Sequence, residues 1–430
     1  MTKISEKIKN VLLYILLIIV VFYVVHSFYY QKASFKELFF GSNGRNWQVS
    51  GNTNYTVNSK DRNILIIYTG GTIGMVETKD GNEPKKGFLE KKLKNYFSSG
   101  MTNSTKSQIS NYKIIEYDPL LDSSNMTIKN WNKMIKTINS NYDKYDAFIV
   151  IHGTDTLSYT ASALSFAFEN LDKPIIVTGS QIPLQKLRND GWSNLITSLM
   201  LASQTNIPEV LVVFDDHVLR GNRSKKISSN KIDAFESPNY ENLGNFGYLT
   251  TEKTASNIWS IAPNLNNKKI ARHPHGRFNA IEYNDTNEVI IIYLTPGFNE
   301  QNILNQIKSN PNIKGAILNT FGIGDGPTGS KSFLNMLSEL NRHNIIILNI
   351  SQCIEGHIDT GDYETGKTMR KYNVISGNDM TLECGYAKLL HLLTKYDNNG
   401  ELYSNRHNIE TMLVKSMRGE LSIDATAFEM

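Results

Sequence analysis

A short apolar run over residues 64–68 leads directly into the sequence Thr69-Gly70-Gly71-Thr72. An apolar run followed by a glycine cluster is typical of a buried parallel strand that ends in a tight turn. Two glycines let the backbone adopt positive φ and approach a ligand closely. The Thr72 hydroxyl is therefore predicted at the carboxyl edge of a parallel sheet, where open α/β folds bind ligands. Taken alone, this stretch is equally well explained as a β–α turn without chemistry.

A second stretch repeats this arrangement. The apolar run over 147–151 ends in His-Gly followed by Thr154 and Asp155, just before a helical pattern. Taken singly, Thr154 or Asp155 is best explained as a helix cap. Two strand ends that present Thr72 and Thr154 to one crevice are hard to explain as two independent caps. We therefore interpret the two stretches as parts of one site.

Strand and helix patterns alternate along most of the chain, which predicts an α/β fold. A larger N-terminal domain over 61–275 is expected to contain a doubly wound, mostly parallel sheet. A smaller C-terminal α/β domain is expected over 286–430. The expected strands cover 63–69, 112–117, 147–151, 174–178, 209–214, 288–294, 315–319 and 345–350, and two clear helical patterns cover 156–169 and 192–202.

The amino terminus is predicted to contain one transmembrane helix. Residues 11–30 are almost entirely apolar or aromatic, and roughly 20 such residues cross a bilayer as a helix. Three lysines lie within residues 1–10, so this segment is expected in the cytoplasm and the body in the periplasm or at the cell surface. The length of the run and the lack of an A-x-A-like site favour an uncleaved, single-pass anchor over a cleaved signal peptide. The polar residues 31–60 are expected to form a flexible linker.

Charge and cysteine content exclude several function classes. A net charge of +4 on 430 residues, with no dense basic tract outside the amino terminus, argues against a nucleic-acid partner. The two cysteines do not make a disulfide framework, and Cys353 is expected to be buried. Neither a CxxC pair nor an HExxH motif occurs, so no metal site is predicted.

The two glycine–threonine stretches together resemble the signature motifs of the L-asparaginase/glutaminase family, the bacterial-type threonine amidohydrolases. The similarity spans roughly residue 63 to the carboxyl end and looks closest to the type I branch. It includes Asp122-Ser-Ser-Asn-Met-Thr127, Thr178-Gly-Ser-Gln-Ile-Pro183, Arg220-Gly-Asn-Arg-Ser-Lys-Lys226, Asp233-Ala-Phe235 and Ser351-Gln-Cys353.

The resemblance implies a catalytic role for four residues. Thr72 matches the family's nucleophile, which attacks the side-chain amide carbon and forms a β-acyl ester. Thr154, Asp155 and Lys226 match a relay of hydroxyl, carboxylate and ammonium across the pocket. A threonine hydroxyl is a weak nucleophile that needs such a neighbouring base or relay. Without the resemblance, Lys226 is best explained as a surface lysine in a basic stretch.

The resemblance also implies how a small amino-acid substrate is held. Asp155 is expected at the α-amino group, and Ser123 and Ser124 match the loop that holds the α-carboxylate. Backbone N–H groups of the glycine turn at Gly71 are expected to stabilise the oxyanion. No metal or organic cofactor is implied. A homodimer or homotetramer is implied, because the family builds its pocket between subunits.

Two departures from the family pattern concern the site. The loop over 76–87, expected to be a mobile lid, lacks the family's tyrosine, whose place falls on Asn82. Because asparagine cannot act as a phenolate, we hypothesise that Glu83 replaces it as base or orienter. The second departure lies at the positions of a type I allosteric site, which carry Lys225 and Asn319, so allosteric control by asparagine is not expected.

A further position in the second domain, where the family often has asparagine, carries Asp325. That carboxylate either alters selectivity near the substrate ammonium or faces solvent.

The leading functional hypothesis is an L-asparagine amidohydrolase that releases L-aspartate and ammonia through an acyl-enzyme, with room for some glutaminase activity. One alternative is a catalytically impaired amino-acid-binding or sensor homologue, suggested by the missing loop tyrosine. The other is the amidase subunit of a tRNA-dependent amidotransferase. The membrane helix argues against that role, since it would separate the body from tRNA.

Overall fold

The computed structural model describes residues 55–58, 62–79, 81–99, 108–249, 260–359, 364–396 and 402–422. The predicted membrane helix over 11–30 and the predicted cytoplasmic segment over 1–10 lie outside these residues. Among the described residues, no helix combines the length and the apolar character needed to cross a bilayer. The end of the predicted linker is packed, because Tyr55 is fully buried and its hydroxyl donates to the Ala271 carbonyl at 2.5 Å.

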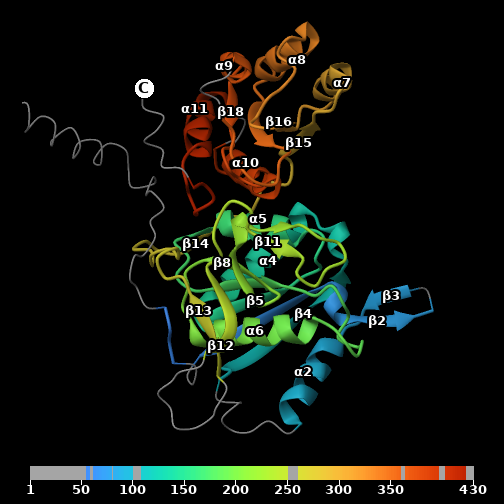
Figure 1. Cartoon of the computed structure of the whole chain (residues 1–430), viewed down its shortest axis with the longest axis vertical. Helices are drawn as coiled ribbons and strands as arrows, with labels where there is room; N and C mark the ends of the chain where they lie inside the picture. The colour runs from blue at the N-terminus through green and yellow to red at the C-terminus, as the bar shows by residue number, and fades with distance from the viewer. Residues whose placement is uncertain are drawn as a thin grey trace, which may run out of the picture. The chain divides into compact units, whose positions relative to one another are not determined.

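A large, mostly parallel sheet forms the first half of the described chain (Figure 1), as predicted. Within the described residues it has eight strands in the order β13-β12-β9-β8-β7-β5-β1-β4. The neighbours from β8 to β4 run parallel, and β9, β12 and β13 continue the sheet in antiparallel fashion. The strands are β1 (Asn63–Gly70), β4 (Asn111–Leu121), β5 (Ala147–Ile151), β7 (Ile175–Thr178), β8 (Val210–Phe214), β9 (His217–Arg220), β12 (Gly244–Leu249) and β13 (Ser260–Leu265).

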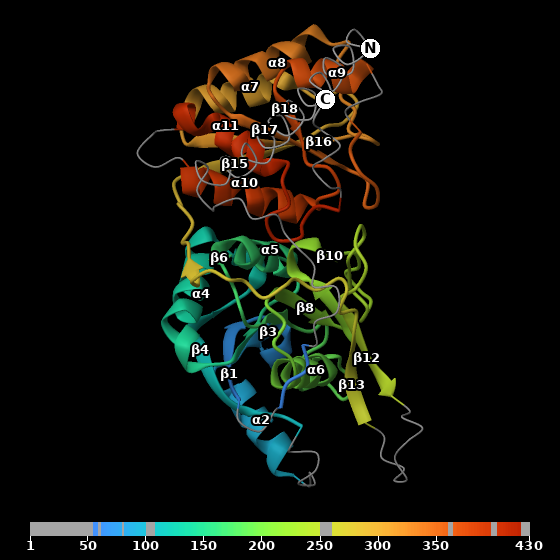
Figure 2. The same cartoon turned by 90° about the vertical axis from the view of Figure 1, so that its left-hand side faces the viewer.

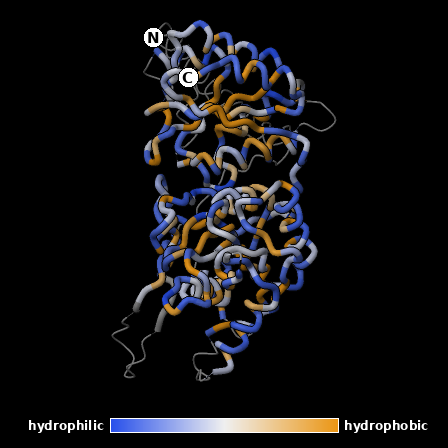
Figure 3. The backbone as a smooth tube through the Cα atoms, turned by 90° about the vertical axis from the view of Figure 1, so that its right-hand side faces the viewer, coloured by the Kyte–Doolittle hydropathy of each residue, from blue (hydrophilic) through white to orange (hydrophobic). Residues whose placement is uncertain are grey.

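Helices cover both faces of this sheet, which explains why its central strands are apolar throughout. Leu65 and Ile67 of β1 face the core beneath α4 (Ile128–Asn141) and α5 (Leu157–Ala167). Ile64 and Ile66 point the opposite way, into the core beneath α2 (Phe88–Ser98) and α6 (Gly191–Gln204). Burial of both faces is the usual state of a parallel sheet with helical crossovers. The apolar segments accordingly lie inside, and the polar ones outside (Figure 3).

A second sheet, of four parallel strands within the described residues, forms the other half in the order β15-β16-β17-β18. Its core packs against α7 and α8. The elements are β15 (Glu288–Tyr293), α7 (Glu300–Ser309), β16 (Ile313–Thr320), α8 (Lys331–Arg342), β17 (Ile346–Ser351), α9 (Glu364–Lys371), β18 (Val374–Ser376), α10 (Leu382–Tyr396) and α11 (Leu402–Leu413).

Helix α10 joins the two halves. It packs against α5 on one side and against β15, β16 and β17 on the other (Figure 2). Its apolar residues, among them Leu389, share one continuous core with Val177 of the large sheet and Ile317 of the small sheet.

Short paired segments complete the fold. The predicted lid is a β-hairpin, in which β2 (Met75–Thr78) pairs with β3 (Gly81–Pro84). Two-residue strands pair as β10 (Lys225–Lys226) with β11 (Phe235–Glu236), and as β6 (Phe168–Glu169) with β14 (Asn279–Ala280).

Candidate active site

The two glycine–threonine stretches meet at the carboxyl ends of neighbouring strands. Strands β1 and β5 are parallel, with Tyr68 opposite Ile151. Beyond that pair, Gly71 adopts a φ of +86°, and a Cβ atom there would lie 2.5 Å from the Cα of Gly153. Only a residue without a side chain fits such an approach. The close contact places the two following residues, Thr72 and Thr154, at one edge of the sheet, as the sequence predicted.

The serine loop lies against the same glycines. The Gly71 amide donates to the Leu121 carbonyl at 3.1 Å, which ties the first turn to the end of β4. A Cβ on Gly153 would lie 2.5 Å from the Oγ of Ser123. Ser123 is buried, whereas Ser124 is exposed and donates its amide to the Asp122 carboxylate at 3.1 Å. The ends of three neighbouring strands, β5, β1 and β4, thus bring threonine and serine residues to one edge of the sheet.

Lys226 completes the predicted relay. Its Nζ lies 2.8 Å from Thr154 Oγ1 and 2.8 Å from Asp155 Oδ1. The side chain of Lys226 is only 20% exposed, whereas that of Asp155 is 63% exposed. The Lys226 ammonium therefore contacts the buried Thr154 hydroxyl on one side and the Asp155 carboxylate, which is partly exposed to solvent, on the other. The explanation of Lys226 as a free surface lysine is wrong.

Sequence reasoning assigned no role to Gln181, although this residue lies in one of the segments that carry the resemblance. The Thr154 hydroxyl donates to Gln181 Oε1 at 3.1 Å while accepting from Lys226. Gln181 is itself held in place. Its backbone N–H donates to the Asp190 carboxylate at 2.8 Å, and its side-chain Nε2 donates to the Lys231 backbone carbonyl at 3.1 Å. Gln181 therefore orients the Thr154 hydroxyl.

His152 stabilises the glycine turn from inside the protein. Its Nδ1 donates to the Gly153 carbonyl at 2.6 Å, and its Nε2 lies 2.9 Å from Thr160 Oγ1, which in turn accepts from Trp131 Nε1 at 2.9 Å. A carbonyl acceptor at Nδ1 requires the proton there, so Nε2 accepts from the threonine. Burial lowers the pKa of His152 to about 4, against the opposing effect of the Gly153 hydrogen bond. The ring is neutral and acts as a fixed support.

This burial makes folding pH-dependent. In the unfolded chain, histidine gains a proton near pH 6.5, whereas folded His152 gains one only near pH 4, so stability is lost as pH falls through that window. The difference between the two pKa values corresponds to about 3 kcal/mol. Burial also lowers the pKa of His391, to about 3, so this residue adds to the loss of stability as the pH falls.

We expect the urea concentration at the unfolding midpoint of the full chain to decrease as the pH is lowered from 6.5 to 4. In a His152→Gln variant this decrease should be smaller. Urea unfolding at pH 7, 5.5 and 4.5 measures both. Equal slopes in the parent and the variant would contradict this assignment.

The predicted lid residues Asn82 and Glu83 are exposed at the hairpin. Strand β3 contacts the turn that carries Thr72, and the Lys85 amide donates to the Gly74 carbonyl at 3.2 Å. The base of the hairpin is therefore bound to the turn that carries Thr72, while the side chains of Asn82 and Glu83 are exposed.

Tyr68 is a buried phenol next to this turn. Its hydroxyl lies directly beside Gly74 and has no hydrogen-bond partner within the described residues. Burial, and then the Glu116 carboxylate, raise the pKa of Tyr68, so it stays protonated at neutral pH. Tyr68 therefore cannot supply the phenolate that the hairpin lacks.

The positions in the second half have structural partners. Asn319 is buried and donates to the carbonyls of Ile350 and Ser351, and Asp325 accepts from the Thr365 hydroxyl. Cys353 is exposed, so the prediction of a buried cysteine is wrong. It lies in the bend that follows β17 and not in the strand itself, and its amide donates to Ser351 Oγ.

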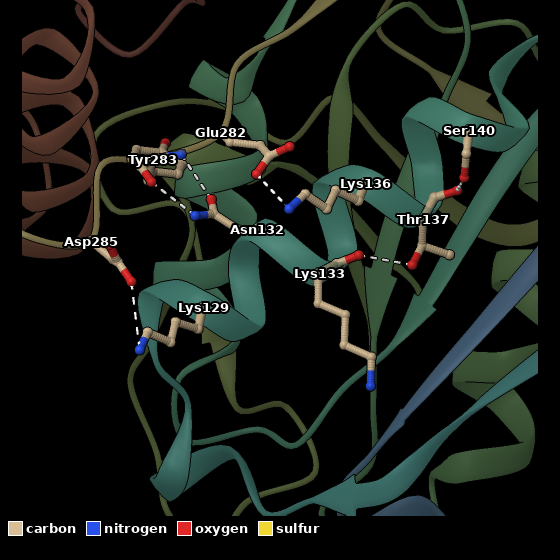
Figure 4. Close-up of a pocket in the computed structure, with 9 residues that line it drawn as sticks. All are labelled: Lys129, Asn132, Lys133, Lys136, Thr137, Ser140, Glu282, Tyr283 and Asp285. Atoms are coloured by element: carbon tan, nitrogen blue, oxygen red, sulfur yellow. Dashed lines mark hydrogen bonds and ion pairs between the residues drawn. The ribbon is translucent and has the colours of Figure 1, made fainter. Parts of the chain in front are cut away.

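A surface cavity of about 740 Å³ lies away from these strand ends, on α4 and the connecting segment 282–285 (Figure 4). Lys136 pairs with Glu282 at 2.9 Å and Lys129 with Asp285 at 3.7 Å. Its lining contains none of the residues predicted for the site. Within the described residues, no cluster of histidine, cysteine, aspartate and glutamate forms a metal-binding arrangement.

Comparisons with known proteins match both halves of the chain. The family model for "Asparaginase, N-terminal" matches residues 63–257, and that for "Glutaminase/Asparaginase C-terminal domain" matches residues 288–404. L-asparaginase 1 of Escherichia coli K12 is 36% identical over 364 residues, which cover 84% of this chain and 99% of that protein. The mouse 60 kDa lysophospholipase is 33% identical over 382 residues, covering 85% of this chain and 64% of that protein. The crystal structure of L-asparaginase I from Vibrio cholerae matches with a TM-score of 0.70 and 37% identity, covering 84% of this chain and 99% of that one.

Proposed function

The chain belongs to the asparaginase/glutaminase family, and on that premise we propose that it hydrolyses the side-chain amide of L-asparagine to L-aspartate and ammonia. Membership makes it an amidohydrolase of the asparaginase type. We further propose that Thr72 is its nucleophile and that Thr154, Lys226 and Asp155 form its proton relay. The observation that carries the proposal is the contact of Lys226 with both Thr154 and Asp155, each at 2.8 Å, beside the turn that presents Thr72.

In the first half-reaction, Thr72 Oγ attacks the amide carbon of the substrate. The new C–O bond makes a tetrahedral intermediate whose oxyanion is stabilised by backbone N–H groups of the glycine turns. Collapse breaks the C–N bond, and the proton lost by Thr72 ends on the leaving ammonia. An aspartyl ester on Thr72 remains.

In the second half-reaction, water attacks the ester and returns the proton to Thr72. When Lys226 is the uncharged amine, Thr154 takes the proton of that water while passing its own proton to Lys226 Nζ, which lies 2.8 Å from Thr154 Oγ1. Asp155 balances the positive charge that Lys226 gains in this step. The product is L-aspartate.

The crevice also suits the substrate's zwitterion. We assign the exposed Asp155 carboxylate to the α-ammonium, and the exposed Ser124 together with the buried Ser123 to the α-carboxylate. Glutamine differs from asparagine by one methylene, and a pocket discriminates such a difference by roughly 1–3 kcal/mol. Some glutaminase activity is therefore part of the proposal.

The test is ammonia release by the full chain from L-asparagine, with L-glutamine and D-asparagine as comparison substrates. We expect turnover of L-asparagine, slower turnover of L-glutamine and little of D-asparagine. Binding of L-asparagine without turnover would favour the amino-acid-binding or sensor alternative. Turnover that requires a charged tRNA and a partner protein would favour the amidotransferase subunit.

Two further parts of the proposal concern assembly and location. We propose a homodimer or homotetramer, which sedimentation of the purified chain tests. We also propose that residues 11–30 anchor the chain in a membrane with the enzymatic body on the outer side. Protease accessibility of the body in intact cells tests that orientation.

The hairpin residue Glu83 gives a separate prediction. If this carboxylate acts as base or orienter for Thr72, Glu83→Gln lowers kcat by about 100-fold, which is typical of a lost general base. Glu77→Gln is the matched control, because Glu77 is an exposed carboxylate on the same hairpin and pairs with Lys186. Full turnover in the Glu83 variant would remove this residue from the mechanism.

A further inference from the structure

Lys226 reaches the site from a very short structural support. Strand β10 consists of Lys225 and Lys226 alone, and its ladder partner within the described residues is the two-residue strand β11. Two ladder positions give little rigidity, because cooperative sheets are built from longer pairings. The position of the Lys226 ammonium therefore depends on what else holds this segment.

The second half of the protein holds it with two ion pairs. Arg223 Nη1 lies 2.9 Å from Asp379 Oδ2, and the two side chains are 1% and 6% exposed. Lys225 Nζ lies 3.0 and 3.2 Å from the two Glu383 carboxylate oxygens, with 25% and 11% of the side chains exposed. Glu383 lies in the first turn of α10, and Asp379 lies in the turn that precedes this helix.

Of the three cationic side chains in this segment, Arg223 and Lys225 pair with the C-terminal half and Lys226 pairs with the predicted site. Successive residues of a strand point to opposite faces. Lys225 accordingly reaches the first turn of α10, while Lys226 reaches Thr154 and Asp155. The two lysines are therefore bound on opposite faces of β10, Lys225 by Glu383 and Lys226 by Thr154 and Asp155.

We infer that Lys225 and Glu383 are positioning residues, which fix β10 from α10 so that Lys226 stays within hydrogen-bond distance of Thr154 and Asp155. The inference rests on the proposed function of Lys226. On this inference, a residue of the C-terminal half, Glu383, positions the Lys226 side chain of the N-terminal half of the same chain. Within the described residues, neither Lys225 nor Glu383 makes a hydrogen bond or ion pair with Thr154 or Asp155, so we infer that they act through the backbone of β10.

The test compares two ion pairs that α10 makes with the N-terminal half. Lys225→Met and Glu383→Gln break the positioning pair. Lys395→Met breaks a matched pair on the same helix, in which Lys395 lies 2.6 Å from Glu169 with 25% of each side chain exposed. Lys225→Arg keeps the charge and is the conservative variant.

We expect Lys225→Met and Glu383→Gln to lower kcat for L-asparagine about tenfold, with KM changed less than about threefold. Lys225→Arg and Lys395→Met should keep kcat within about twofold of the parent. Hydrogen exchange of backbone amides in residues 221–228, which needs no turnover, should accelerate in Lys225→Met and not in Lys395→Met.

Equal kcat losses in Lys225→Met and Lys395→Met, or unchanged exchange in the positioning variants, would overturn the inference. An inactive parent would contradict the proposed function instead. In that case the exchange comparison still decides whether the pair holds β10.

Discussion

Replacing Thr72 by alanine is expected to lower kcat for L-asparagine by roughly 10⁴-fold or more, the scale seen when a covalent nucleophile is removed. Without the hydroxyl no ester forms, and water must attack the amide directly in an otherwise intact crevice. Binding of L-asparagine should remain, because the contacts assigned to Asp155, Ser123 and Ser124 do not involve Thr72.

Steady-state ammonia release measures the loss, and calorimetry with L-asparagine measures the binding. Thr72→Ser is the conservative control, since it keeps a nucleophilic hydroxyl at the same turn and should keep part of the activity. A Thr72→Ala variant within about tenfold of the parent would exclude Thr72 as the nucleophile.

Replacing Lys226 by methionine is expected to lower kcat by about 10³-fold, within the range of lost proton transfer. The variant keeps the unbranched apolar part of the side chain but leaves Thr154 without its donor and Asp155 without its counter-charge. Thr154→Val should cost a similar factor. Because both residues act in one relay, the double variant should lose little more than either single variant.

Lys231→Met is the matched control for this series, since Lys231 has an exposed side chain in the same region and contributes its backbone carbonyl to Gln181. It should keep kcat within about twofold of the parent. If the kcat of the Lys226 and Thr154 double variant falls by the product of the two single-variant factors, the two residues act independently. That result would contradict a shared relay.

The central parallel strands were predictable from sequence because their burial is nearly uniform, whereas β9, β12, β13 and β18 were not among the expected strands. Expected strands at 63–69 and 147–151 correspond to β1 (63–70) and β5 (147–151), which are buried along almost their whole length. Apolar runs bounded by glycine or threonine mark such strands without any tertiary information. The two-residue strand β10 carries no such signal, because its residues are both lysines.

The site was predictable only in part. Thr72 and Thr154 follow adjacent strands, so the pattern alone placed them together. Lys226 lies 72 positions from its partner Thr154, and the resemblance, not the pattern, connected the two. Gln181 and the His152 support went unassigned, because their roles depend on hydrogen bonds across the fold.

The lid shows where local composition misleads. The sequence predicted a mobile lid over 76–87 without indicating strands in it, and the segment pairs as a hairpin through Val76 with Glu83 and Glu77 with Asn82. Exposed pairing of polar residues has no hydrophobic alternation to reveal it. For the same reason the packing of Tyr55, which depends on the distant Ala271, was not expected from a polar linker.

The central claim is that an aspartyl ester forms on Thr72 during L-asparagine turnover. The most direct measurement is mass spectrometry of acid-quenched Lys226→Met protein after mixing with L-asparagine, because slowed deacylation lets the ester accumulate. The account predicts an aspartyl adduct on the peptide that contains Thr72, and none in the Thr72→Ala variant. An adduct on another residue, or ammonia release with no adduct at any time, would contradict it.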